Sequence, residues 1–217
     1  MEMKLNPKFQ EEYSSKLPAL TLLTQLGWTF LSPEKALSYR GGNTSDVLLR
    51  NALIEQLSQR SFVYAGNNHR LSNNSIDSIV STIASPALNE GLLAANEKLY
   101  NHLIYGISVT EFIDGKKHSP TIPLIDWANP LNNSFHFTEE FTVTRSGGIE
   151  NRRPDIVCFV NGIPLVIIEA KRPDAHANKG PTIDEGISQT LRNQRSDEIP
   201  LLVAYSQLLL SINGTEG

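Results

Sequence analysis

The chain has 217 residues, of which 40% are hydrophobic and 19% charged, and these values suit one globular domain or one domain with an extension. The formal net charge of -4 excludes a uniformly basic surface, so any contact with DNA must come from a local basic patch. A single cysteine, Cys158, excludes an internal disulfide and indicates a reducing compartment. No apolar run approaches the roughly 18 to 20 residues that span a membrane, and the first residues lack a signal-peptide pattern. We therefore expect a cytoplasmic protein without a membrane segment.

Residues 1–45 are expected to form a mostly helical N-terminal extension, followed by the main domain over residues 46–217. Residues 11–26 have apolar residues at helical spacing, and residues 27–31 resemble a short strand. Ser32 before Pro33 is a typical helix start.

The first half of the main domain shows a helical pattern. Residues 47–59 form an amphipathic helix in this interpretation, and residues 67–75 form a polar connection. Residues 75–85 predict another helix, and a further one begins at Pro86 and ends at Gly106. The side chains expected to face inward from the first of these helices are Val47, Leu48, Leu49, Ala52, Leu53, Ile54 and Leu57.

After Gly106 the apolar residues alternate with period two, which favours strands. Residues 107–113 predict a strand that ends in a turn at 114–115, and residues 135–144 predict one longer strand after an asparagine-rich loop. Near the C-terminus, Thr182 and Glu185 resemble a capping box at the start of a helix. Residues 201–205 and 207–212 predict two last strands.

The most informative stretch contains two apolar runs, residues 156–160 and 163–168, separated by Asn161-Gly162. This dipeptide is a strong signal for a tight β-hairpin. Both runs are apolar on both faces, which places them in the centre of a covered sheet. Charged residues at the ends of such strands are costly to bury, so Asp155, Glu169 and Lys171 require a functional reason.

The loop length decides whether the two acids meet. A two-residue turn with a regular ladder would place Asp155 opposite Ile168, with the acids on opposite faces of the sheet. A three-residue loop over 161–163, followed by a bulge, would place Asp155 directly opposite Glu169, with Lys171 on the same face. We predict the three-residue loop, because Pro164 argues against a full ladder at that point.

Two neighbouring carboxylates repel one another unless a cation lies between them. Mg²⁺ binds oxygen ligands and is typically held by one or two carboxylates, with Mn²⁺ as a possible substitute. The metal would activate water and offset charge on a phosphodiester, while Lys171 would hold or deprotonate the attacking water or stabilise the phosphorane. Arg153, Arg172 and Lys179 lie near this stretch in sequence and are candidate phosphate contacts.

Pro154-Asp155, followed one hairpin later by Glu169-Ala170-Lys171, resembles the PD-(D/E)XK nuclease motif. With the flanking residues 152–165, it resembles the amino-terminal part of the restriction subunit of type I restriction-modification enzymes. This resemblance implies an α/β fold with a mixed central sheet flanked by helices and an N-terminal helical region. It also implies a nuclease for double-stranded DNA in which Asp155, Glu169 and the carbonyl of Ala170 bind metal.

Two further positions come from the resemblance. The segment 96–109 also resembles the family, and Glu97 is the nearest candidate for the acid that such folds carry on a helix before the sheet. The family usually has glutamine and, four residues later, tyrosine on the helix after the hairpin. Gln189 matches this pattern and is a candidate DNA contact facing the active site, but Asn193 occupies the tyrosine position.

In the resembling family, methyltransferase and specificity subunits supply sequence recognition, and further domains supply ATP-driven translocation. This chain has no G-x-x-x-x-G-K-[ST] motif, so we expect no ATP site and interpret it as the nuclease part alone. Two alternatives remain open. The chain could be a non-catalytic docking module for the methyltransferase core or DNA, or a repair or junction nuclease on the same fold.

Overall fold

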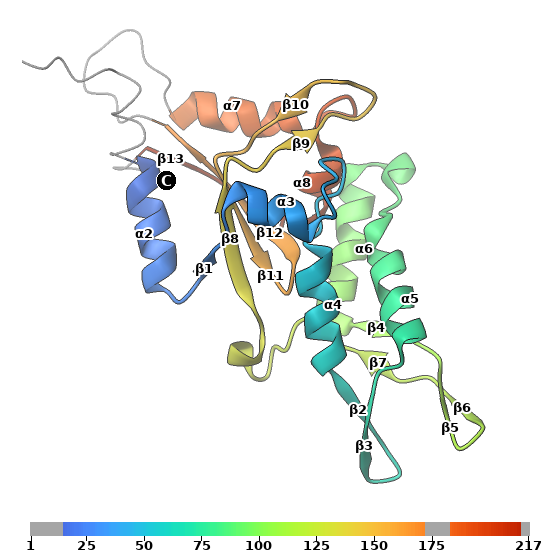
Figure 1. The fold of residues 1–217 in the computed structure, drawn as a ribbon. Coiled ribbons are helices and arrows are strands. Elements are labelled where there is room, and N and C mark those ends of the chain that lie inside the picture. The colour runs from blue at the N-terminus through green and yellow to red at the C-terminus, as the bar shows by residue number, and fades with distance from the viewer. Residues whose placement is uncertain (1–14, 172–182, 214–217) are drawn as a thin grey trace, which may run out of the picture.

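A five-stranded mixed sheet organises the fold (Figure 1). The computed structural model describes residues 15–171 and 183–213. The strand order is β1 (Thr29–Phe30), β8 (Phe135–Glu139), β11 (Ile156–Val160), β12 (Ile163–Ala170) and β13 (Leu208–Ile212). The three central strands are antiparallel, whereas β1 and β13 each join an edge in parallel. The predicted α/β class with a mixed sheet flanked by helices is confirmed, and the hairpin lies inside the sheet.

The turn of the central hairpin differs from the prediction. Val160 pairs with Ile163, and Asn161 and Gly162 both have positive φ, at 52° and 81°. These are the features of a two-residue type I′ turn, so the predicted three-residue loop is wrong. The expected bulge is present but lies further along the strand, at Leu165. Phe159 pairs with Pro164 and Cys158 pairs with Val166, which leaves Leu165 as the extra residue.

This bulge produces the predicted register, which we had attributed to a three-residue loop. Beyond it, Ile156 pairs with Ile168, so Asp155 comes next in line with Glu169. Pro164 cannot donate a ladder hydrogen bond, and a bulge beside it is the usual accommodation.

The hairpin turn is locked against the helix layer. Gly162 accepts a hydrogen bond from the backbone N–H of Leu49, just before α4 (Arg50–Gln59), at 2.9 Å. A Cβ at Gly162 would lie only 2.5 Å from the Leu49 carbonyl oxygen, so glycine is required here. The buried Asn161 amide donates to the Leu124 carbonyl and to Asn133 Oδ1, each at 2.8 Å. The predicted Asn-Gly turn therefore also anchors the sheet to its surroundings.

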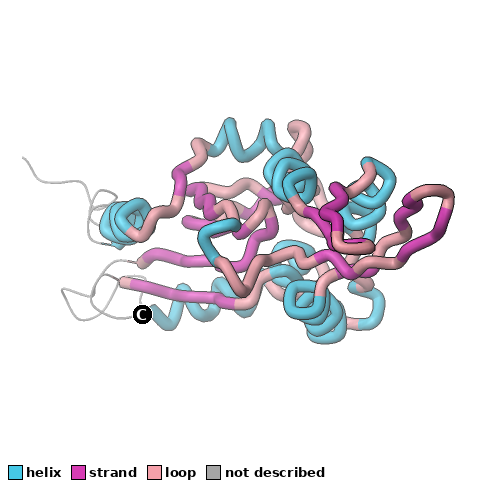
Figure 2. The backbone as a smooth tube through the Cα atoms, turned by 90° about the horizontal axis from the view of Figure 1, so that it is seen from below, coloured by secondary structure: helices cyan, strands magenta, loops and turns pink. Residues whose placement is uncertain are grey.

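The two faces of the sheet have separate cores, and Figure 2 shows the strands between helices. On one face Val157, Phe159 and Ile167 join the large core formed with α4, α5 (Asn73–Ala84), α6 (Leu92–Tyr105) and α8 (Pro200–Tyr205). On the other face Ile156 and Cys158 pack beneath α2 (Leu17–Gln25). Cys158 is buried, and burial raises the pKa of its thiol to about 12.

Several local predictions are confirmed, and others are corrected. Ser32 caps α3 (Pro33–Tyr39) by accepting a hydrogen bond from the N–H of Lys35, and Gly106 ends α6 with φ of 77°. The predicted helix start at Pro86 is wrong. A 3-10 turn spans Leu88–Glu90, and α6 begins at Leu92 after Gly91, whose φ of 102° breaks any continuous helix. Ile54 is 41% exposed rather than inward-facing.

Two strand predictions are also wrong. Residues 135–144 do not form one strand, because Glu140 has φ of 52° and interrupts it. Beyond this break, β9 (Val143–Thr144) pairs instead with β10 (Asn151–Arg152). The segment 201–205 belongs to helix α8, which begins with Pro200 at its first position. A short, continuously apolar run has no period that separates a buried strand from a buried helix.

Several short strands lie at the end of the molecule remote from α2 (Figure 1). The predicted turn at residues 114–115 joins β5 (Glu111–Ile113) to β6 (Lys116–His118), and β4 (Ile107–Ser108) pairs with β7 (Thr121–Ile122). A further 3-10 turn spans Pro130–Asn132. Part of the predicted polar connection is instead a hairpin of β2 (Ser61–Tyr64) and β3 (Asn67–Arg70).

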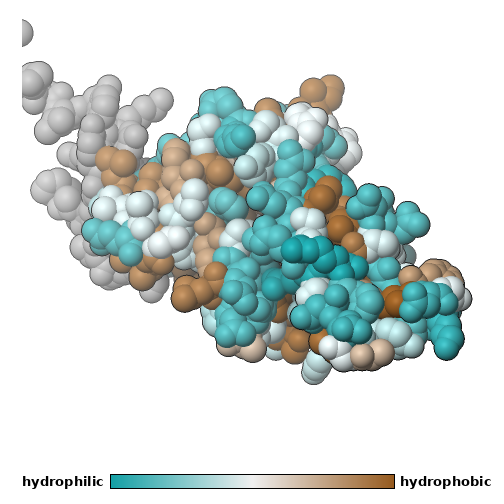
Figure 3. Space-filling view, turned by 60° about the horizontal axis from the view of Figure 1, so that its bottom comes forward, coloured by the Kyte–Doolittle hydropathy of each residue, from teal (hydrophilic) through white to brown (hydrophobic). Residues whose placement is uncertain are grey.

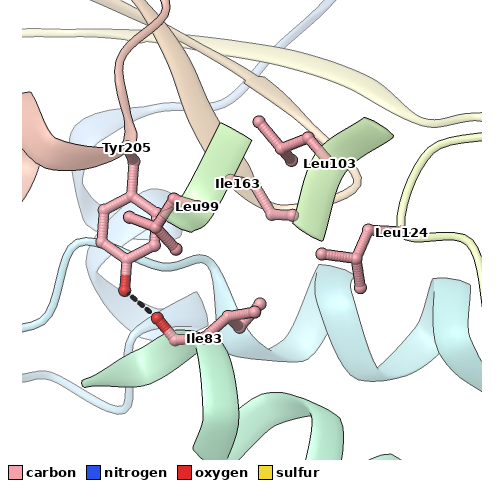
Figure 4. Close-up of a pocket in the computed structure, with 6 residues that line it drawn as sticks. All are labelled: Ile83, Leu99, Leu103, Leu124, Ile163 and Tyr205. Atoms are coloured by element: carbon pink, nitrogen blue, oxygen red, sulfur yellow. Dashed lines mark hydrogen bonds between the residues drawn. The ribbon is translucent and has the colours of Figure 1, made fainter. Parts of the chain in front are cut away.

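The surface of the described residues is mostly polar, with scattered apolar side chains (Figure 3). In Figure 3 the visible surface is largely hydrophilic and is interrupted by apolar patches. The exposed apolar side chains include Leu26, which follows α2, and Phe30 of β1. Across the described ranges, no helix has the length and apolar character needed to cross a membrane. Residues of the large core enclose a cavity of about 10 Å³, beside which Tyr205 donates a hydrogen bond to the carbonyl of Ile83 (Figure 4). This volume is at the lower limit for one water, so the cavity is a packing gap.

The boundary at residue 45 stays a prediction. Strand β1, from the segment that we expected to be an extension, forms one edge of the central sheet.

Candidate active site

The hairpin brings Asp155 and Glu169 together at one end of the sheet. Ile156 pairs with Ile168, and the next residues outward are the two acids. The N–H of Ala170 donates to Asp155 Oδ2 at 2.8 Å, which fixes this carboxylate beside the end of β12. Because side chains alternate along a strand, both acids lie on the face of the large core. The predicted meeting of the two acids is therefore present.

Glu169 is an unusual carboxylate because it is fully buried. Burial, followed by the nearby negative charge of Asp155, raises its pKa to about 8, while the positive charges of Lys171 and Arg192 act in the opposite direction. Its Oε2 accepts a hydrogen bond from Gln189, but its Oε1 has no partner among the described residues. A buried carboxylate oxygen without a partner is costly, so a proton or a bound cation is needed to satisfy it.

Gln189 joins Glu169 to Lys171. Its Nε2 donates to Glu169 Oε2 at 2.8 Å, and its Oε1 accepts from Lys171 Nζ at 3.1 Å. Lys171 is itself buried, and its backbone N–H donates to the Ile212 carbonyl at 2.7 Å. One side-chain amide therefore sets the relative positions of the acid and the ammonium group.

Helix α7 (Ile183–Asn193) carries Gln189 and approaches the sheet closely at Gly186. A Cβ at Gly186 would lie 2.0 Å from Ser211 Oγ on β13 and 3.3 Å from Lys171 Cγ. Only glycine allows this approach without adjustment. Gly186 is about one turn before Gln189, so the same packing sets the height of the amide above the sheet.

Asn193, at the position where the resembling family has tyrosine, lies one turn after Gln189 and is buried. Its Oδ1 has no hydrogen-bond partner within the described ranges. The Thr182 cap lies outside the described residues, so the predicted capping box is untested.

The other predicted site residues are not all brought together. Arg153 lies two residues before Asp155, but its Nε is paired with Glu140 Oε2 at 2.5 Å. Arg172 and Lys179 lie outside the described residues. These residues stay predicted phosphate contacts.

Glu97 is exposed on α6, where the adjacent Asn96 donates to the carbonyls of Ala204 and Ser206. Ser206 lies just before β13, so this bond places Asn96 near the start of that strand, where Leu208 pairs with Val166. Glu169 pairs with Ser211, near the other end of β13. The part of the chain that is described contains no group of three or more His, Cys, Asp or Glu residues able to hold a metal. Glu97 therefore does not complete a three-acid cluster with Asp155 and Glu169.

Sequence reasoning missed the groups that approach the site from the N-terminal segment. Ser15 Oγ donates to the carbonyl of Lys171 at 2.5 Å, and Lys16 Nζ lies between the carboxylates of Glu139 and Glu140. These pairs join residues more than 120 positions apart in sequence, and no local pattern marks them.

Comparison with known proteins bears on this site. Residues 8–217 match the family model described as the type I restriction enzyme R protein N terminus. The putative type I restriction enzyme MjaIXP endonuclease subunit of Methanocaldococcus jannaschii is 27% identical over 219 residues, covering 96% of this chain and 19% of that subunit. The type I restriction enzyme HindI endonuclease subunit of Haemophilus influenzae is 27% identical, covering 90% of this chain and 18% of that subunit.

A further relative from Methanocaldococcus jannaschii, the putative type I restriction enzyme MjaVIIP endonuclease subunit, is 37% identical over 114 residues. These cover 51% of this chain and 9% of that subunit. The chain thus spans less than a fifth of the length of these three relatives.

Proposed function

The chain belongs to the family of type I restriction enzyme R protein N-terminal regions, and we propose that it is a metal-dependent endonuclease domain that hydrolyses phosphodiester bonds in double-stranded DNA. In this proposal, sequence recognition by specificity and methyltransferase subunits and ATP-driven translocation are supplied from outside the chain. The relatives are named as endonuclease subunits, which supports a nuclease role. The proposed site of action is the cytoplasm.

The observation that carries the proposal is the buried Oε1 of Glu169, which lies beside Asp155 and has no hydrogen-bond partner among the described residues. Two carboxylates with an unsatisfied oxygen fit a hard divalent cation, which prefers oxygen ligands. We assign Asp155, Glu169 and the carbonyl of Ala170 as ligands for Mg²⁺, with Mn²⁺ as a substitute. The cation would lower the pKa of bound water and offset charge on the phosphoryl group.

The protein groups have distinct roles in this mechanism. The Ala170 N–H holds Asp155 in one orientation, so a ligand oxygen is fixed before the substrate arrives. Gln189 keeps Lys171 beside Glu169. An ammonium group has three donors, and the bond to Gln189 uses one of them. The others can orient the attacking water and stabilise charge that develops on the phosphate. Arg153, Arg172 and Lys179 are assigned to backbone phosphates, where they position DNA without selecting sequence.

A docking module would have less need of this arrangement. A buried carboxylate with a strongly raised pKa, next to a second acid and a lysine, is typical of a functional site. A scaffold without catalysis would be more stable with apolar residues in these positions.

Calorimetric titration with Mn²⁺ or Mg²⁺ tests the proposal without requiring the motor domains. We expect the wild-type chain to bind metal, and Asp155→Asn and Glu169→Gln to lose at least tenfold in affinity while remaining folded. Glu97→Gln is the matched control, because it removes an acid that lies outside the pair, and it should bind like the wild type. If the wild type binds neither metal, with DNA present or absent, the nuclease assignment fails and the docking module becomes the better interpretation.

A further inference from the structure

A second charged cluster lies at the same end of the sheet as the acid pair. Glu140 accepts a cation on each of its carboxylate oxygens. Lys16 Nζ lies 2.5 Å from Oε1, and Arg153 Nε lies 2.5 Å from Oε2. Lys16 also pairs with Glu139 Oε2, at 2.8 Å. Two cations from distant parts of the chain therefore converge on one anionic group.

The backbone places this cluster beside the candidate active site. The N–H of Glu140 donates to the carbonyl oxygen of Asp155 at 2.9 Å, so the two residues lie side by side just beyond the paired ends of β8 and β11. Neighbouring strands are about 4.8 Å apart. One strand of duplex DNA carries a phosphate every 3.4 Å or so along the helix axis. A phosphate close to the one being cut is therefore within reach of this cluster.

The two cations differ in how firmly they are held. Lys16 is mostly buried, with 12% of its side chain exposed, and it keeps Glu139 as a partner if Glu140 moves. The Arg153 side chain is 66% exposed, and Glu140 is its one ion-pair partner among the residues described. An exposed guanidinium can exchange one carboxylate for a phosphate, since it binds both with the same planar geometry.

We propose that a DNA backbone phosphate displaces the Glu140 carboxylate and binds between Lys16 and Arg153. The inference rests on the proposed function and adds a phosphate subsite to it. Glu140 occupies this subsite in the DNA-free protein and competes with DNA for Arg153. Lys16 and Glu139 form the fixed wall of the subsite.

The displaced side chain has space beside it. Glu140 lines a surface hollow of about 150 Å³, together with Leu37, Arg40 and Phe141. Arg40 is almost fully buried over the Phe141 ring, and its Nε has no hydrogen-bond partner among the described residues. A carboxylate that turns toward this hollow meets another positive charge.

Fluorescence anisotropy with a labelled 25-base-pair duplex of arbitrary sequence, in EDTA to prevent cleavage, tests the competition. We expect Glu140→Gln to tighten binding about two- to fivefold, the range set by the loss of one exposed ion pair. Glu97→Gln is the matched control, since it removes the same charge at an exposed position outside the subsite without freeing Lys16 or Arg153, and its effect should be smaller. Arg153→Gln should weaken binding and reduce the number of released counterions by about one.

The double variant Glu140→Gln/Arg153→Gln tests whether the gain in DNA affinity depends on Arg153. We expect Glu140→Gln to lose most of its effect in the Arg153→Gln background. Equal gains from Glu97→Gln and Glu140→Gln, or a gain that persists without Arg153, would overturn the subsite while leaving the nuclease proposal in place. Failure of the wild-type chain to bind the duplex at all would count against both.

Discussion

The close approach of α7 to the sheet at Gly186 allows a sharp test of how Gln189 is positioned. Replacing Gly186 with alanine puts a Cβ at 2.0 Å from Ser211 Oγ, 3.1 Å from Ser211 Cβ and 3.3 Å from Lys171 Cγ. Either Ser211 must rotate and give up its hydrogen bond to the Ile183 carbonyl, or α7 must move outward. Outward movement would lengthen both hydrogen bonds of Gln189.

The expected magnitude follows from two opposing effects. Alanine is a better helix former than glycine by about 1 kcal/mol, whereas overpacking costs about 1–3 kcal/mol. Gly186→Ala should therefore lower the free energy of unfolding by about 0–2 kcal/mol. Ser211→Ala alone should cost about 1 kcal/mol, because it removes one hydrogen bond. In the Ser211→Ala background the 2.0 Å contact is gone and only the contacts at 3.1 Å and 3.3 Å remain, so Gly186→Ala should become close to neutral.

Urea denaturation of the wild type, both single variants and the double variant measures this coupling. We expect an interaction energy of about 1–2 kcal/mol between the two positions. Additivity within about 0.5 kcal/mol would refute the reasoning, because it would mean that the two residues do not contact one another.

Two further predictions concern the hairpin turn and the buried acid. Gly162→Ala should cost at least about 3 kcal/mol in urea denaturation, because it combines a positive φ with a Cβ 2.5 Å from the Leu49 carbonyl oxygen. Gly115→Ala, with a similar φ and nothing within 4 Å, should cost only about 1–2 kcal/mol, and equal losses would contradict the packing argument. Glu169 has a folded-state pKa of about 8, above the ordinary value, so in EDTA the native state should lose stability as pH rises from about 4.5 to 8. Glu169→Gln removes this loss, so its free energy of unfolding relative to wild type should increase between pH 5 and pH 8; a constant difference would show that the carboxyl titrates normally.

The sequence alone determined features that depend on neighbouring residues. Asn161-Gly162 specified the hairpin, since both residues tolerate the positive φ that a type I′ turn needs. Unbroken apolar runs on both sides of it predicted central strands, and Ser32 and Gly106 marked the ends of helices correctly. The spacing of Asp155, Glu169 and Lys171 also identified the residues that the fold gathers at one sheet end, although their chemical roles stay predictions.

Features that depend on contacts between distant residues were decided only by the tertiary structure. The bulge at Leu165 sets the register of the hairpin. A three-residue loop would have produced the same register, and the sequence pattern is compatible with both. Whether the apolar run 201–205 becomes a strand or a helix depends on its packing against α6, since its composition fits both. Likewise, Glu97 and Glu140 are both acids in polar surroundings, and only the chain path places Glu140 next to Asp155. Local chemistry fixes turns and helix ends, whereas contacts between remote segments depend on how the layers pack.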